Sequence, residues 1–121
     1  FFFCDLFLDI RDMIKLGQIY LGNGEFEGKR YLSEDWVKEA VKSHIPSDII
    51  NPAKVGKDET AGYGYYFWRN KHNNGYRAYG REGQFIIVLP EKNAVIAVTA
   101  MHSNVQEVLD LIWENIEPLL N

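Results

Sequence analysis

The most informative residues for chemistry form a glycine-punctuated segment, Gly80-Arg81-Glu82-Gly83-Gln84, that runs directly into an apolar strand. Glycine lets a backbone approach a ligand closely or bend sharply, so the segment fits either a binding site or a turn. It lacks the spacing of a phosphate-binding loop, and a strand rather than a helix follows it. Which of the two roles applies depends on the groups that accompany it.

No nucleophile with a partner base stands out in the sequence. None of the serines has a lysine three residues later, and neither a Gly-x-Ser-x-Gly nor a His-Glu-x-x-His motif occurs. Ser33, which follows Tyr31 in a Tyr-x-Ser arrangement, is better explained as a helix cap. The histidines His44, His72 and His102 are widely spaced, and we expect surface or strand-end roles for them. By themselves the residues predict no catalytic side chain, no metal site and no cofactor.

The composition indicates one globular domain, residues 1–121, or a fragment of one. Hydrophobic residues make up 46% of the chain and aromatic residues 14%, which is enough for a packed core. A formal net charge of −4 argues against a general nucleic-acid binder, which needs a basic face. The single cysteine, Cys4, excludes an intrachain disulfide and a thiolate zinc site. Residues 1–8 are apolar but too short to span a bilayer and unlike a signal peptide, so we interpret them as a cut end; no other window predicts a membrane span.

Two helices are predicted in the first third of the chain. Asp9 is expected to cap the first, which reaches Leu21 and is ended by Gly22-Asn23-Gly24. Residues 24–31 look like a polar connector. Ser33 is expected to cap the second helix, with acidic residues in its first turn. The positions expected on the inner face of that helix are Trp36, Val37, Ala40 and Val41.

The remainder of the chain predicts an irregular loop, an antiparallel meander and a last helix. Residues 44–61 carry prolines, glycine and many polar groups, so we expect a long loop there, mobile or functional. The predicted strands are 63–68, 76–79, 85–89 and 94–101, with hairpin turns at 71–75 and 90–93. Asn104 or Ser103 is expected to cap a final helix that packs on the sheet. The fold class is therefore α/β of the α+β type, with helices covering an antiparallel sheet.

The order of these segments resembles the C-terminal part of the serine β-lactamase-like family, which includes class C β-lactamases, penicillin-binding proteins that act as D-alanyl-D-alanine peptidases, and related esterases. Four stretches carry the resemblance: residues 12–24, 28–37, 62–67, and 80–84 with the turn at Pro90. Each is weak alone, but the four in this order are specific, and together they cover the chain from about Leu6 onward.

The resemblance implies an acyl-enzyme chemistry of which this chain holds one part. The family's third active-site element aligns with Ala78-Tyr79-Gly80, on a strand whose backbone binds a small acyl substrate such as an ester, a β-lactam or a peptide. The backbone N–H of Arg81 would then donate to the oxyanion. Ala78 stands where relatives carry a cation or an imidazole, which puts recognition of a substrate carboxylate in doubt.

The resemblance also implies what the chain lacks. The Ser-x-x-Lys and Tyr-x-Asn elements would lie upstream in a longer protein, so we expect the chain alone to be inactive. Relatives that act on peptidoglycan or β-lactams work outside the cytoplasm, which suggests a cell-envelope location for the parent. Strands from the missing part would complete the sheet, so we expect an exposed edge and self-association through it. The alternative is a stand-alone peptide- or protein-binding module without catalysis.

Overall fold

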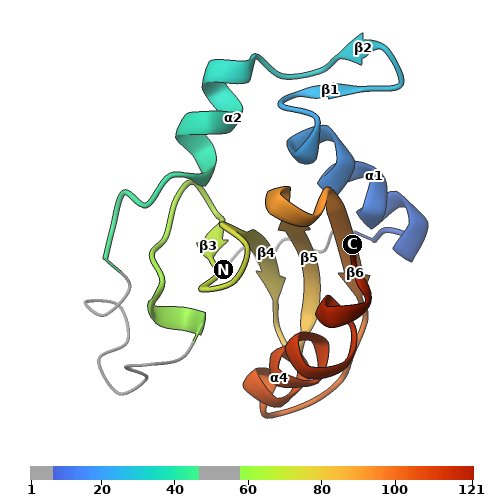
Figure 1. Ribbon diagram of the computed structural model, residues 1–121, viewed down its shortest axis with the longest axis vertical. Helices are drawn as coiled ribbons and strands as arrows, with labels where there is room; N and C mark the ends of the chain where they lie inside the picture. The colour runs from blue at the N-terminus through green and yellow to red at the C-terminus, as the bar shows by residue number, and fades with distance from the viewer. Residues whose placement is uncertain (1–6, 47–57) are drawn as a thin grey trace.

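The computed structural model describes residues 7–46 and 58–121, and its centre is a four-stranded sheet between two helices (Figure 1). Cys4, most of the N-terminal stretch 1–8 and residues 47–57 of the predicted 44–61 loop lie outside the described residues. At the end of that loop, Asp58–Thr60 form a short 3-10 turn, η2. Two helices, a meander and a final helix follow one another as the sequence predicts.

The sheet is an antiparallel meander in the order β3-β4-β5-β6. Its strands are β3 (Trp68–Arg69), β4 (Tyr76–Gly80), β5 (Gln84–Leu89) and β6 (Ala94–Val98). Asn73 and Asn74, with φ of 52° and 48°, turn the chain between β3 and β4, as asparagine does readily in the left-handed region. The 3-10 turn η3 (Pro90–Lys92) joins β5 to β6. Both predicted hairpin turns are confirmed.

Helix α1 (Ile10–Leu21) covers one face of the sheet. The carboxylate of Asp9 accepts a hydrogen bond of 2.8 Å from the backbone N–H of Arg11, so the predicted cap is confirmed. The helix approaches the sheet closely at Gly17, which is buried. A Cβ built at Gly17 would overlap Cγ1 of Val95 and lie 3.0 Å from Cγ2 of Ile86. Glycine at this position therefore sets the distance between α1 and the sheet.

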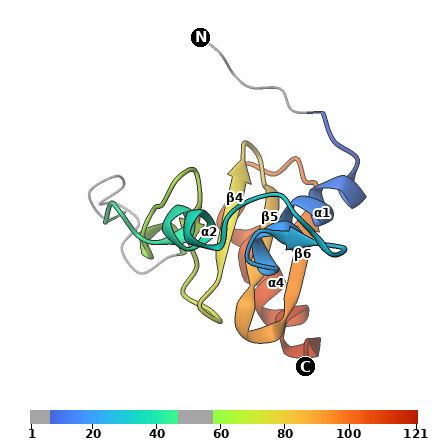
Figure 2. The same cartoon turned by 90° about the horizontal axis from the view of Figure 1, so that it is seen from above.

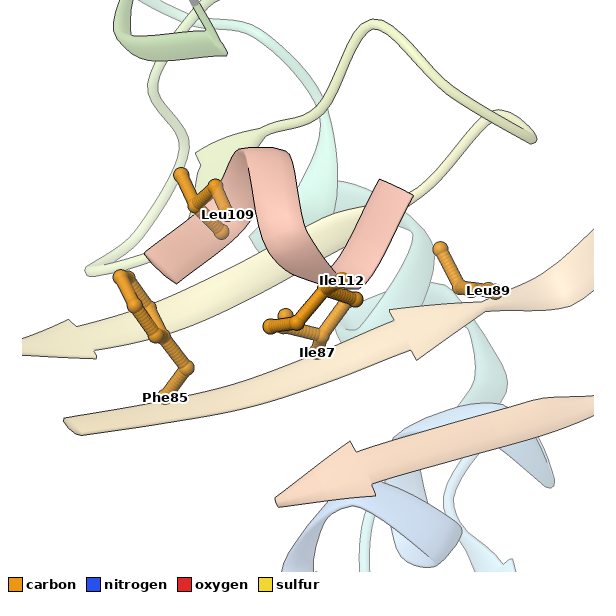
Figure 3. Packing of buried hydrophobic residues seen from close by; sticks show 5 residues of the cluster. All are labelled: Phe85, Ile87, Leu89, Leu109 and Ile112. Atoms are coloured by element: carbon orange, nitrogen blue, oxygen red, sulfur yellow. The ribbon is translucent and has the colours of Figure 1, made fainter. Parts of the chain in front are cut away.

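Helix α4 (Val105–Asn115) covers the opposite face, and the main core lies beneath it. Figures 1 and 2 show the two helices on different sides of the sheet. Figure 3 shows side chains of β5 directed at α4 while α1 lies beyond β6. Each fully buried side chain of this kind contributes about 1.5–3 kcal/mol. The buried cluster consists of Phe85, Ile87, Leu89, Leu109 and Ile112.

A small accessory region forms in place of the predicted polar connector. Strands β1 (Glu25–Phe26) and β2 (Lys29–Arg30) pair as a hairpin. Helix α2 (Glu34–Val41) follows, and the hydroxyl of Ser33 accepts from the backbone N–H of Trp36 at 3.1 Å, which confirms that cap. Val37 and Ala40 are buried as expected, but Trp36 is half exposed, so its assignment to the inner face was wrong.

Two predicted strand boundaries and one predicted capping interaction are corrected by the structure. The aromatic stretch 63–68 is not a strand, because only Tyr63 makes isolated bridges and the strand proper starts at Trp68. The last strand ends at Val98 rather than at residue 101. Asn104 occupies the capping position of α4, but its side chain makes no capping hydrogen bond and donates instead to Glu107 at 2.8 Å.

Candidate functional site

The second half of β4, Ala78–Gly80, extends beyond its neighbour β3. Strand β3 pairs only with Tyr76 and Arg77, whereas β5 pairs with all of β4. Among the described residues, two strands therefore flank β4 only at its start.

A groove of about 840 Å³ includes this half of β4 in its lining. Residues from both faces of the sheet line it: Ala78 pairs with Ile86 on the α1 face, and Tyr79 pairs with Phe85 on the α4 face. Its volume is in the range of small-molecule sites. The groove is lined by Phe7, Leu8, Asp9, Met13, Tyr63, Tyr66, Trp68, Ala78, Tyr79, Gly80, Gln84, Phe85, Ile86 and Thr99.

Three aromatic side chains from the stretch before and at β3 form one wall of the groove, and we name Tyr63, Tyr66 and Trp68 the aromatic wall. The rings of Tyr63 and Trp68 meet edge to face with centroids 4.8 Å apart, and Trp68 meets Tyr79 of β4 in the same way at 6.4 Å. Edge-to-face pairs of this kind hold ring orientation. The wall is therefore coupled to the strand it faces.

The aromatic wall is anchored to the end of α2. The backbone N–H of Tyr65 donates to the carbonyl of Ala40 at 2.8 Å. Gly64 lies against the same helix end, where a Cβ would overlap the carbonyl oxygen of Ala40. This close approach is the structural reason for glycine at position 64.

The groove is short of positive charge. Asp9 is the single charged residue among the described residues that line it. Burial raises the pKa of the Tyr63 hydroxyl, so the phenol stays protonated at neutral pH and is unsuited to the role of a general base. The described part of the groove thus offers aromatic surface, the backbone of β4 and one carboxylate.

The glycine segment forms the turn between β4 and β5. Arg81, Glu82 and Gly83 connect Gly80 to Gln84, with φ of 65° at Glu82 and 91° at Gly83. The carbonyl of Glu82 accepts from the backbone N–H of His102 at 2.9 Å, which ties the turn to the segment before α4. The segment is consequently a hairpin turn, and its first glycine also lines the groove.

The predicted site residues are thus only partly brought together. Ala78, Tyr79 and Gly80 line the groove, whereas Arg81 is exposed in the turn and is not among the lining residues. Sequence reasoning missed the aromatic wall and the contribution of Asp9 and Met13. Propensity predicts a regular strand over the tyrosine-rich stretch 63–68, and only Gly62 and Gly64 indicate a loop held against another element.

A second, smaller hollow of about 270 Å³ lies between η2 and α4. Its buried carboxylate, Asp58, accepts hydrogen bonds from the indole N–H of Trp113 at 2.7 Å, the amide of Gln106 at 3.3 Å and the backbone N–H of Lys71 at 3.3 Å. Three donors to one buried carboxylate indicate that Asp58 has a structural role. His72 stacks on Trp113 beside it, in keeping with the surface role expected for that histidine.

Comparisons with known proteins support the fold. No family model and no curated protein matches the chain. Among solved structures, it is similar to a provisionally assigned 6-aminohexanoate-dimer hydrolase from Bacillus anthracis, with a TM-score of 0.62 and 21% identity. The match covers 88% of this chain and 26% of that protein, so the chain spans about a quarter of its relative's length. In the described residues, no helix is long and apolar enough to cross a membrane. The chain has a partial β-lactamase-like fold built on a four-stranded antiparallel sheet.

Proposed function

We propose that this chain is the C-terminal portion of a serine acyl hydrolase and supplies its substrate-binding edge strand. The observation that carries the proposal is that Ala78, Tyr79 and Gly80 of β4 together line a groove of about 840 Å³. The family resemblance assigns the substrate strand to these same three residues. The fold shared with a hydrolase four times as long agrees with a fragment of such an enzyme.

In this proposal the chain binds and polarises the acyl group while another part of the protein attacks it. An extended substrate would lie in the groove beside the backbone of Ala78–Gly80. The backbone N–H of Arg81 would donate to the developing oxyanion at the end of the strand. The nucleophilic serine and its lysine would come from the preceding part of the protein, so the isolated chain would bind without turnover.

The test begins with the sequence upstream of Phe1 in the reading frame. A Ser-x-x-Lys motif there is expected, and the longer protein should hydrolyse simple esters such as vinyl acetate, followed by proton release. Changing that serine to alanine should abolish turnover, and the isolated chain should show none. A reading frame that starts near Phe1, or turnover by the isolated chain, would contradict the proposal.

The groove also allows a second candidate, a ligand-binding module without catalysis. It is favoured by the fact that residues of this chain alone line the groove, with no serine, cysteine or lysine among the described ones. Saturable ligand binding by a protein whose reading frame holds no Ser-x-x-Lys would support this alternative over the hydrolase.

A further inference from the structure

Tyr66 occupies a backbone position that suits glycine or asparagine far better than tyrosine. Tyr63 bridges Trp68, and the N–H of Gly64 donates to the carbonyl of Phe67 at 2.7 Å, so Tyr65 and Tyr66 form a two-residue hairpin loop. Tyr66 takes φ of 63° at the second loop position. A side chain in this left-handed region is strained, because its Cβ crowds the backbone.

The other residues with this conformation show how unusual Tyr66 is. Among the described residues, seven other than glycine have positive φ, and Tyr66 is the only aromatic one. The others have short polar or acidic side chains and lie in turns. They are Asn23, Glu27, Asn73, Asn74, Glu82 and Asn93.

Packing within the chain does not account for the aromatic ring at this position. The Tyr66 side chain is largely exposed, at 87% of its maximum. A strained residue whose ring is not buried gains little folding stability from being tyrosine. Strain of this kind is characteristic of residues held for ligand contact. Tyr66 also lines the groove together with Tyr63 and Trp68.

The chemistry of the groove restricts the ligand that such a ring would meet. Among the described residues, the lining has no lysine, arginine or histidine, and its one charged residue is Asp9. A carboxylate on the substrate would meet no cation in this described part of the lining and would be repelled by Asp9. An uncharged aromatic or extended apolar group would instead lie against the aromatic wall and bury the exposed ring of Tyr66.

We propose that Tyr66 determines substrate specificity, completing an aromatic wall that selects aromatic or extended apolar acyl groups without a carboxylate. The inference rests on the proposed hydrolase function and adds to it the class of acyl group. It differs from a structural role for Tyr66, because glycine at this position would relieve the backbone strain while removing the ring.

The experiment uses the longer protein that carries this chain and three vinyl esters, whose leaving group is not aromatic. The esters are vinyl acetate, vinyl phenylacetate and monovinyl glutarate. The wild type should prefer phenylacetate to the carboxylate-bearing glutarate by about tenfold or more in kcat/KM. Tyr66→Gly should lower the ratio of phenylacetate to acetate by roughly tenfold, through KM, as expected for loss of one aromatic contact. Tyr66→Phe should restore the ratio.

The matched control is Glu27→Gly, which makes the same backbone change, at φ of 51°, in the β1–β2 hairpin away from the groove lining. It should leave all three esters unaffected, and the melting temperature of Tyr66→Gly should equal or exceed that of the wild type. A ratio that Tyr66→Gly leaves unchanged, an equal fall for acetate and phenylacetate, or a preference for glutarate overturns the inference. Hydrolysis of none of the esters overturns the proposed function itself, and this inference with it.

Discussion

The placement of α1 on the sheet depends on the absence of a side chain at Gly17, and Gly17→Ala tests it. A methyl group there would overlap Cγ1 of Val95 and crowd Cγ2 of Ile86, which lies 3.0 Å from the new Cβ position. Val95 is β-branched and held in β6, so its side chain has little freedom to turn away. Either α1 or β6 must therefore move.

Two opposing terms set the size of the effect. Replacing glycine by alanine within a helix stabilises by about 1 kcal/mol through helix propensity. Overpacking of a well-packed contact costs about 1–3 kcal/mol, and the overlap with Val95 places this substitution near the upper end. The net expectation is a loss of about 1–2 kcal/mol in the free energy of unfolding. In a domain of this size that lowers the melting temperature by roughly 3–6 °C per kcal/mol.

Urea unfolding followed by circular dichroism measures the effect, and a double-mutant cycle assigns it to the contact. In a Val95→Ala background the overlapping methyl group is gone, so Gly17→Ala should there stabilise by about 1 kcal/mol. Gln18→Ala, on the same helix, serves as the control for propensity alone. If Gly17→Ala stabilises the wild-type chain, α1 does not lie against β6 at this distance, and the groove wall formed by Asp9 and Met13 is misplaced with it.

Three further outcomes follow from other parts of the structure. Burial raises the pKa of the Tyr76 hydroxyl from 10.0 to about 12, so its contribution to stability is complete below pH 10 and is lost as pH rises through 12. The free energy of unfolding of the wild type should therefore fall by about 2–3 kcal/mol between pH 9 and pH 12 through this group, and Tyr76→Phe should lack that fall. Asp58→Asn should lower the free energy of unfolding in urea by about 1–3 kcal/mol, because the indole of Trp113 and two other donors lose a carboxylate acceptor. A loss below about 0.5 kcal/mol would show that these hydrogen bonds contribute little to stability. Because β6 pairs only with β5 among the described residues, we expect the isolated chain to self-associate through that edge, and a strict monomer at high concentration in light scattering would contradict this.

Local signals predicted the elements whose geometry is set within a few residues. The caps at Asp9 and Ser33 and the Asn73-Asn74 turn before β4 each depend on a side chain that satisfies or permits the backbone next to it. The two long apolar strands predicted a sheet covered on both faces, and α1 and α4 cover it. These features need no knowledge of distant parts of the chain.

The groove was harder to predict, because segments far apart in sequence assemble it. The beginning of α1, the aromatic wall and β4 meet only in the folded chain. The half-exposed position of Trp36 has the same origin, because tertiary packing buries Val37 and Ala40 of α2 and leaves the indole of Trp36 partly in solvent. Periodicity identifies an apolar face but not how far that face extends.

The clearest failure of the sequence rules, the stretch 63–68, is also the most informative about function. Aromatic residues there favour a strand by propensity, yet the chain bends into a two-residue loop whose second residue, Tyr66, has an unfavourable side chain for its φ of 63°. Glycine or asparagine suits this conformation better, as at Asn73, Asn74 and Gly83 in other turns of this chain. Natural sequences depart from local preference mainly where a site requires it. The conflict at Tyr66 therefore points to the groove that β4 lines, and it does so from backbone geometry, independently of the family resemblance.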